Sequence, residues 1–229
     1  MEKVKITVDI VSDVVCPWCF IGKRRLERAM LQLAETYTFE VFWHPFQLNA
    51  TIPAEGIDWE SYMTQKFGSA AQMQQTFDQV TQIGKAEGIN FDFVNTKKAI
   101  NTFHLHRLLR FALEKGRQIQ LAEVFFKANF EQNLDLLDNN VLISLLEQVG
   151  YTTEEAKEAV LGEHFREETI AVLKHLATQG ISGVPLFIIN NQYAVSGAQS
   201  VESFVNVFTK AKQETTDTTG ACDVAEGDC

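Results

Sequence analysis

The stretch VKITVDIVSDVVCPWCFIGKRRLERAMLQLA, residues 4–34, decides the fold. Apolar and polar residues alternate along Val4–Val11 and become apolar on both faces near its end, which predicts a strand running into the core. Apolar residues then recur at helical spacing, which predicts a helix over about Phe20–Ala34. Cys16-Pro17-Trp18-Cys19 lies at the junction, so two cysteines precede the predicted helix directly.

A CxxC motif at this junction has two chemical interpretations. A helix N-terminus carries roughly half a positive charge, and a cysteine there can have a pKa of about 3.5–7.5 instead of about 8.5. We therefore interpret Cys16 and Cys19 as a redox-active pair. CxxC is also half of a four-cysteine zinc site, and the chain contains Cys222 and Cys229. Six residues separate these two, which is unlike the short spacing of zinc knuckles, so the zinc site is the weaker alternative, followed by incidental thiols.

Composition limits the class of protein. The 229 residues are 45% apolar and include 17 Phe, enough to fill a core without disulfide staples. Four cysteines are too few for a disulfide scaffold. The net charge of −10 argues against a nucleic-acid partner. Without an apolar leader or a membrane-length apolar run, we expect a soluble, cytoplasmic protein with no membrane partner.

The rest of the chain divides into three blocks. A second predicted strand over residues 39–44 completes a parallel, right-handed βαβ unit. Residues 59–160 have helical periodicity and no convincing strand. A helix over about 163–179, a hairpin of strands 186–189 and 193–196 around Asn190-Asn191, and a last helix over about 201–210 follow. The helical segments of the middle block are predicted near 57–67, 70–87, 96–115, 118–131, 139–149 and 153–160.

This order predicts an α/β protein with a thioredoxin-like fold and a large all-helical insertion between its βαβ and ββα halves. We assign residues 1–50 and 161–213 to the thioredoxin-like domain and residues 51–160 to the insertion. Residues 214–229 are predicted to be a disordered acidic tail that carries two cysteines.

Further motifs connect the chain to a known family. Val184-Pro185 lies in a loop before the hairpin, where an X-Pro bond can be cis. With the CPWC motif, the chain resembles the DsbA-like thioredoxin-fold proteins of the FrnE type, whose relatives include 2-hydroxychromene-2-carboxylate isomerases and kappa-class glutathione transferases. The resemblance covers about residues 4–210 and rests also on WHPFQLN (43–49), NTFHLHRL (101–108), SGVPLF (182–187) and VSGAQ (195–199).

The resemblance implies a thiol–disulfide oxidoreductase in which Cys16 is the nucleophile and Cys19 the resolving thiol. It implies a cis Pro185 packed against the disulfide and a Val184 backbone that pairs with an extended substrate. The expected partners are polypeptide thiols or disulfides and a reductase. No metal or organic cofactor is required, although glutathione could act as reductant. A glutathione-dependent transferase or isomerase is the alternative, but those relatives carry Ser at the first Cys position.

Two features depart from the family pattern. Trp18 stands where periplasmic DsbA proteins have His, and it offers an apolar face to a substrate or a simple plug. Many relatives keep a buried acid on the strand before the motif. Asp9 and Asp13 are the candidates here, and neither obviously matches its spacing.

Three further groups of residues need an interpretation. His104 and His106 point about 200° apart on a helix and cannot share a metal. His106 is interpreted as a residue packed beneath the active-site face, with lining of the substrate cleft as the second possibility. Asn101 is a helix-cap or buried hydrogen-bonding residue, and a weaker cleft candidate. Lys23-Arg24-Arg25 is interpreted as a solvated helix face that could add positive potential near the thiols.

Cys222 and Cys229 carry a separate hypothesis. About nine residues separate the last predicted helix from Cys222, a root-mean-square reach of roughly 15–18 Å. We therefore hypothesise that they form an auxiliary redox pair that exchanges with Cys16 and Cys19 of the same molecule.

Overall fold

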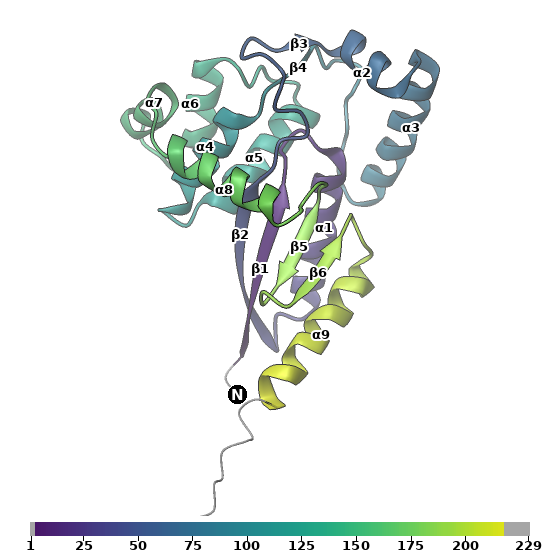
Figure 1. Ribbon diagram of the computed structural model, residues 1–229, viewed down its shortest axis with the longest axis vertical. Coiled ribbons are helices and arrows are strands. Elements are labelled where there is room, and N and C mark those ends of the chain that lie inside the picture. The colour runs from purple at the N-terminus through teal and green to yellow at the C-terminus, as the bar shows by residue number, and fades with distance from the viewer. Residues whose placement is uncertain (1–2, 218–229) are drawn as a thin grey trace, which may run out of the picture.

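The computed structural model describes residues 3–217 (Figure 1). A four-stranded sheet has the order β2-β1-β5-β6, and a two-stranded sheet pairs β3 with β4. The elements are β1 Val4–Ser12, α1 Pro17–Gln32, β2 Tyr37–Pro45, β3 Ile57–Asp58, α2 Trp59–Phe67, α3 Ala70–Ala86, β4 Lys98–Ala99, α4 Phe103–Leu113, α5 Gln118–Phe130, α6 Asn139–Gln148, α7 Thr153–Leu161, α8 Arg166–Thr178, β5 Leu186–Ile189, β6 Tyr193–Ser196 and α9 Val201–Asp217.

The larger sheet has the predicted topology. β1 pairs in parallel with β2 and antiparallel with β5, which continues into the hairpin partner β6. Asn190 and Asn191 form the hairpin turn with φ of 50° and 55°, a conformation that Asn tolerates better than most residues. The order βαβ, helix, ββα, with helices between the two halves, is the predicted thioredoxin-like fold.

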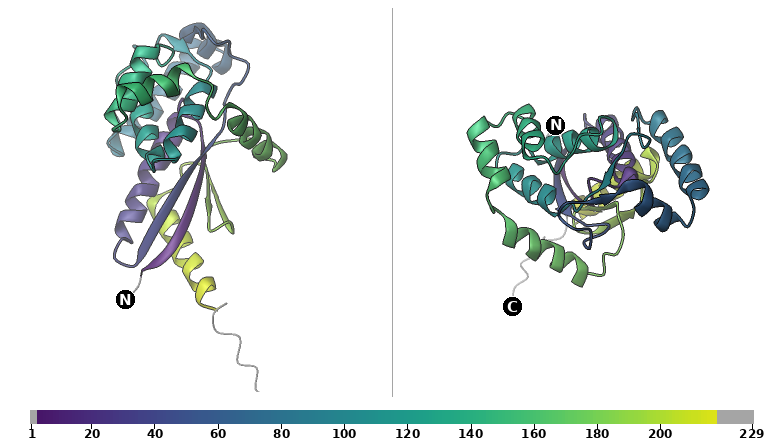
Figure 2. Two further views of the ribbon diagram at one scale, coloured as in Figure 1. Left: turned by 90° about the vertical axis from the view of Figure 1, so that its left-hand side faces the viewer. Right: turned by 90° about the horizontal axis from the view of Figure 1, so that it is seen from above.

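The helices α1 and α9 pack against each other, and α9 also contacts β1, β5 and β6. β1 alternates between buried and more exposed side chains and ends in three consecutive buried residues, Ile10 to Ser12. This pattern carries the chain from the surface of the sheet into the core at the point where α1 begins. Helices α2 to α7 gather around this end of the sheet, as Figure 1 and the turned views of Figure 2 show.

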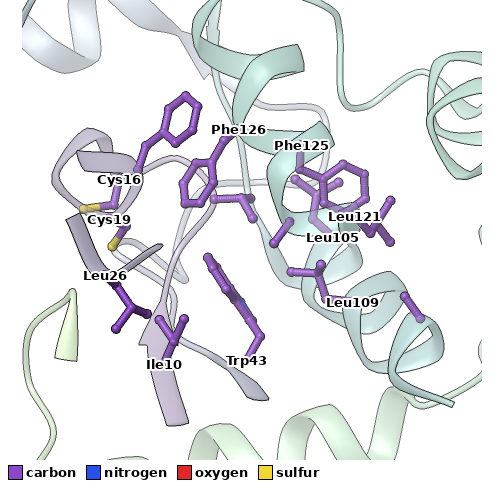
Figure 3. Packing of buried hydrophobic residues seen from close by; sticks show 14 of the residues in the cluster. Ile10, Cys16, Cys19, Leu26, Trp43, Leu105, Leu109, Leu121, Phe125 and Phe126 are labelled. Carbon is purple, nitrogen blue, oxygen red and sulfur yellow. The ribbon is translucent and has the colours of Figure 1, made fainter. Parts of the chain in front are cut away.

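The helical block and the sheet share one hydrophobic core. Phe20 of α1 stacks on Phe126 of α5 with ring centroids 4.7 Å apart. Trp43 of β2 contacts the same ring, with centroids 5.6 Å apart (Figure 3). The buried Gln118 amide bonds both the N–H and the C=O of Trp43, at 2.8 and 3.0 Å. These bonds satisfy backbone groups of the edge strand β2 and fix α5 beside it.

Several element boundaries differ from the prediction. Residues 96–102 are not helical, because Lys98 and Ala99 pair with Ile57 and Asp58 in the two-stranded sheet. The prediction of no strand in the middle block was therefore wrong by one two-residue strand. α2 begins at Trp59 because Asp58 caps it by accepting from the N–H of Ser61.

The last helix is longer than predicted. It continues to Asp217 instead of ending near Lys210, so residues 214–217 are helical and the prediction of a tail beginning at 214 was wrong there. A formed helix adds one hydrogen bond for each further residue, and no Gly or Pro interrupts this sequence before Gly220. Cys222 and Cys229 lie outside the described residues.

Candidate active site

The turn between β1 and α1 positions the two cysteines. Cys16 is the N-cap of α1, with φ −98° and ψ 111°, and Pro17 follows in the first helical turn, where its missing N–H costs nothing. The N–H of Cys16 donates to the Asp13 carbonyl, and the N–H of Cys19 donates to the Cys16 carbonyl, each at 3.0 Å. The helix therefore starts directly at the first thiol.

The two free thiols differ in their surroundings. Both are buried in the core beneath the first turn of α1, Cys16 with 4% and Cys19 with 2% of its surface exposed, but Cys16 also lines a cavity and Cys19 does not (Figure 3). Burial raises the pKa of the Cys19 thiol well above its ordinary value, and the hydrogen bond and charge of Cys16 raise it further. The Ser12 side chain and the Asp13 backbone lower the pKa of Cys19 by a smaller amount. At neutral pH Cys19 is therefore a protonated thiol, and Cys16 is the thiol of the two that lines the cavity.

The loop before β5 approaches the motif from the other side. The Val184–Pro185 peptide bond is cis, as the resemblance implies. Gly22, one turn after Cys19, permits close contact between α1 and this loop. A Cβ at Gly22 would lie 3.2 Å from Pro185 Cγ and 2.9 Å from Phe187 Cζ. The absence of a side chain at Gly22 thus lets α1 pack directly on the cis-proline loop.

A cavity of about 270 Å³ opens at Cys16. The motif contributes Cys16, Pro17 and the 38% exposed Trp18, and Val184 contributes from the cis-proline loop. The opposite walls come from the helical block and include Trp59, Tyr62, Met63, Phe67, Phe77, Val80 and Phe93. The first thiol therefore faces a largely aromatic hollow between the sheet domain and the insertion.

Neither of the two predicted cleft candidates lines this cavity. Asn101 accepts from the N–H of Phe103 at 3.0 Å and donates to the carbonyl of Ile52 at 2.8 Å, so it fixes a loop and the start of α4. It also lines a separate hollow of about 550 Å³ with His104 and Arg107. The side chain of His106 has no exposed surface, in agreement with the interpretation that it packs beneath the active-site face.

The sequence suggested Asp13 as one of two candidates for the buried acid of the family. In the structure Asp13 is buried next to His106. Asp13 is 1% exposed, lines the cavity beside Cys16 and lies 3.4 Å from His106 Nε2 through its Oδ1. Its Oδ2 accepts from the N–H of Leu48 at 2.8 Å. Asp9, the other candidate, pairs with His44 at 2.7 Å and is not part of this cluster.

The basic run on α1 is not a solvated face. Lys23 is 2% exposed and pairs with Glu27 and Glu123, and Arg24 pairs with the same two carboxylates. Arg25 pairs with Glu87 at 2.7 Å. The interpretation of this run as solvated was wrong because its carboxylate partners come from α5 and from the end of α3, far along the chain.

Two further searches concern the described residues alone. Over residues 3–217, no group of three or more His, Cys, Asp or Glu side chains could hold a metal ion. Within the same range, no helix combines the length and the hydropathy that crossing a bilayer demands. A four-cysteine zinc site would need Cys222 and Cys229, which this range does not include.

The chain is similar to proteins of one family. The model of the DSBA-like thioredoxin domain matches residues 7–209. The uncharacterized protein YwbO of Bacillus subtilis (strain 168) is 26% identical over 200 residues, covering 87% of this chain and 94% of YwbO. A probable DsbA oxidoreductase from Streptomyces coelicolor superimposes with a TM-score of 0.84 at 29% identity, over 98% of this chain and 94% of that one.

A more distant structure has the same fold. The cytosolic disulfide reductase DsbM from Pseudomonas aeruginosa, solved with GSH, superimposes with a TM-score of 0.60 at 17% identity, over 90% of this chain and 99% of that one. The family match spans nearly all of the described residues and includes the CPWC turn and the cis-proline loop. The protein therefore belongs to the DSBA-like thioredoxin domain family.

Proposed function

We propose that the protein is a thiol–disulfide oxidoreductase that acts on polypeptide thiols or disulfides through Cys16 and Cys19. The observation that carries the proposal is the asymmetry of the two thiols. Both thiols are buried, but Cys16 caps a helix and lines a cavity with Val184, whereas Cys19 does not line it and its raised pKa keeps it protonated. In a pair of this kind, one sulfur can form a mixed disulfide with the substrate and the other can resolve that disulfide.

The exchange then runs in two steps in either direction. For reduction of a substrate, the Cys16 thiolate attacks the substrate disulfide, forms a mixed disulfide and releases one substrate thiolate. Cys19 then attacks the Cys16 sulfur and releases the second substrate thiolate, which leaves a Cys16–Cys19 disulfide. For oxidation the same steps run backwards. No organic or metal cofactor takes part, and a cellular reductase or glutathione would return the pair to the dithiol form.

The aromatic cavity supports a polypeptide substrate. Its volume of about 270 Å³ suits a few residues around a cysteine, and its walls bury apolar side chains. Val184 offers backbone groups beside Cys16 for pairing with an extended segment. We further propose that the protein works in the reducing cytoplasm, in line with a cysteine count too low for a disulfide scaffold.

Trapping of the mixed disulfide tests the proposal. Cys19→Ser cannot resolve, so it should accumulate a covalent adduct with a reduced, unfolded polypeptide supplied with a mild oxidant. Cys16→Ser, the matched control, should form none. Non-reducing electrophoresis and mass mapping of the bonded cysteine read out the result. An adduct on Cys19 in the control, or none on Cys16 in the trap variant, would contradict the proposal.

We also propose an auxiliary redox role for Cys222 and Cys229. The length of α9 limits which of these two cysteines can reach Cys16. α9 ends beside the start of β1, away from the first turn of α1 (Figure 1). The nine residues of β1 span about 30 Å, whereas five residues from Asp217 to Cys222 span at most about 18 Å. Cys222 therefore falls short of its own Cys16, and we propose exchange through Cys229 or between two molecules.

Disulfide mapping of Cys19→Ser protein at low and high concentration tests this pair. A Cys16–Cys229 bond within one chain, or a concentration-dependent bond between chains, is expected. Absence of any bond between Cys16 and a tail cysteine would remove the auxiliary role. One tightly held zinc per chain, measured on purified protein, would instead favour a structural role for the four cysteines.

A glutathione-dependent transferase or isomerase is the second candidate. The enclosed cavity favours it, because a tripeptide thiol and a small apolar molecule would both suit such a hollow, and the DsbM structure was solved with GSH. Glutathione-dependent turnover of a small substrate that survives Cys16→Ser would establish this activity. Loss of that turnover in Cys16→Ser would leave disulfide exchange as the function.

A further inference from the structure

A second hollow, of about 550 Å³, is distinct from the cavity at Cys16. Residues of one segment, 47–54, form a wall of each. Ala50 lines the second hollow, whereas Leu48 and Ile52 line the cavity at Cys16. The exchange proposed at Cys16 makes no use of the second hollow.

The charge of this second hollow is unusual for so acidic a chain. Its lining contains Arg107 and Arg166 but, over the described residues, no Asp or Glu, whereas the whole chain has a net charge of −10. His104 also lines it, and burial lowers the pKa of this imidazole, so the ring is uncharged at neutral pH. The lining therefore carries two positive charges, and we call it the arginine hollow.

Three helices begin at the arginine hollow. Its lining includes the first residues of α4, α6 and α8, which are Phe103, Asn139 and Arg166. These helices lie together in the upper left of Figure 1. The N-terminal end of a helix carries roughly half a positive charge, so the three ends add to the potential of the two arginines. The acidic residues at these ends do not line the hollow; they are Asp138, Glu167 and Glu168.

Arg107 is held in place and still has free donors. It is 6% exposed, and it donates to the carbonyls of Ala159, Val160 and His164 at 2.8, 3.2 and 3.3 Å. These bonds use at most three of its five N–H groups, and among the described residues the other two have no partner. A buried charge is costly unless a counter-charge pairs with it. Arg107 thus lines the hollow as a buried cation that, within the described range, forms no salt bridge.

Arg166 is the second cation and is more exposed. It donates to Glu163 at 2.9 Å, and the side chains of this pair are 51% and 71% exposed. Exposed ion pairs contribute little, so an anion in the hollow can compete for this guanidinium. Burial lowers the pKa of Arg107; Glu163 raises it, and the charge of Arg166 lowers it. The two guanidinium groups are therefore close enough to repel each other, and an anion bound to both would relieve that repulsion.

Much of the remaining lining is apolar. Phe103, Leu108, Leu137, Leu142 and Val160 contribute to it, and a volume of about 550 Å³ is typical of sites for small molecules. Guanidinium groups bind carboxylates and phosphates through paired hydrogen bonds. The ligand that matches this lining is small, anionic at one end and apolar at the other.

We propose that the arginine hollow binds a small organic anion, a carboxylate or a phosphate monoester, through Arg107 and Arg166. The anionic group lies at the two guanidinium groups and the helix ends, and the apolar body packs on Leu108 and Leu142. This inference adds a ligand site to the protein and does not depend on the exchange at Cys16 and Cys19.

Isothermal titration calorimetry of the full chain with benzoate and with phenyl phosphate tests the site. At least one probe should bind once per chain with a dissociation constant below about 1 mM. The tighter probe shows whether a carboxylate or a phosphate is preferred. Acetate and inorganic phosphate should bind at least about tenfold more weakly, because they bury little apolar surface. No saturable binding of either probe up to about 10 mM, or equally tight binding of the small anions, would overturn the inference.

Two variants locate the bound probe. Arg166→Gln removes a positive charge and Ala50→Trp fills the hollow, so each should weaken binding at least about tenfold. Both residues are exposed, so these variants should fold, and circular dichroism checks that they do. Arg107 is left unaltered because its hydrogen bonds hold the end of α7. Unchanged affinity in both variants would contradict the assignment.

Arg110→Gln is the matched control for the charge. Arg110 lies over the Phe165 ring at 5.1 Å, much as Arg166 lies over Phe103 at 5.3 Å, but it does not line the hollow. Its removal should change the affinity less than about twofold. Weakening equal to that of Arg166→Gln would show only general attraction of anions to the chain and would exclude a site.

Thr76→Trp is the control for position, since Thr76 lines the cavity at Cys16 and not the arginine hollow. The affinity for the probe should be the same in this variant as in the unaltered protein. Loss of binding in Thr76→Trp would place the probe beside Cys16 and would refute the second site.

Discussion

The helix α1 changes its role along its length. Its first turn carries Cys16 and Trp18, which both line the aromatic cavity. Its next turns carry Lys23, Arg24 and Arg25, whose charges pair with carboxylates of other elements. We expect the positions of the two thiols to depend on these ion pairs, because the pairs hold α1 against α5 and the end of α3.

We expect the largest effect from a substitution of Glu123, which pairs with Lys23 and Arg24 of α1. Burial raises its pKa, but the hydrogen bond of Arg24 and the charge of Lys23 outweigh that effect and lower it to about 2. Glu123→Gln would leave the buried Lys23 with Glu27 alone, so we expect the free energy of unfolding to fall by about 2–3 kcal/mol. Urea denaturation at neutral pH measures it.

The pH dependence of this pair has a definite sign. The folded state lowers the pKa of Glu123 from the ordinary 4.5 to about 2, so its stabilisation is complete above the ordinary value and is lost as pH falls from there towards 2. The difference in stability between the unaltered protein and Glu123→Gln should shrink over that window. Glu40→Gln, whose partner Lys5 is 60% exposed, is the control and should cost under about 0.5 kcal/mol. Equal losses in both variants would contradict the anchoring role.

A substitution at Gly22 tests the contact between α1 and the cis-proline loop. A methyl group there would meet the fully buried Phe187 ring and Pro185. Overpacking costs about 1–3 kcal/mol, and the better helix propensity of Ala returns up to about 1. Gly22→Ala should therefore lose about 1–2 kcal/mol of stability in thermal denaturation. Gly183→Ala, with nothing within 4 Å of its new methyl, should not be destabilised; a comparable loss there would show that the contact at Gly22 is not special.

A substitution that fills the cavity should have the smallest effect, and it is measured on the reaction rate. Thr76 lines it from α3, so Thr76→Trp should fill part of it and lower the second-order rate with a peptide disulfide about fivefold, since less apolar surface can be buried. Ala50→Trp, which faces the separate hollow of about 550 Å³, is the matched control and should change this rate less than twofold. The reverse ranking would move the substrate site to the larger hollow.

The first turn of α1 could be predicted because its signals are local. The alternating strand, the two cysteines with a proline, and the following helix occupy consecutive residues, and β5 and β6 were predicted to the residue for the same reason. The two-residue strands β3 and β4 were missed since two residues give no periodicity. The length of α9 was missed because polar residues extend it beyond its apolar face.

The ion pairs of Lys23, Arg24 and Arg25 and the contact between Asp13 and His106 could not be predicted, because the partners lie far apart along the chain. Lys23 looks solvated until Glu123, a hundred residues later, is placed beside it. Asp13 could not be assigned from its spacing to the cysteines. His106 stood out in the sequence, but only the fold brings its ring to 3.4 Å from Asp13. One signal was available: Asp13 lies three residues before the CPWC motif, and His106 lies within the NTFHLHRL motif.

The central claim is that the first turn of α1 presents Cys16 and withholds Cys19. Brief alkylation of the reduced protein with iodoacetamide at neutral pH, followed by mass mapping of both cysteines, tests it directly. The raised pKa and burial of Cys19 predict that Cys16 is modified at least tenfold faster, and that Cys19 reacts only after denaturation. Equal rates, or faster modification of Cys19 in the folded protein, would contradict the account.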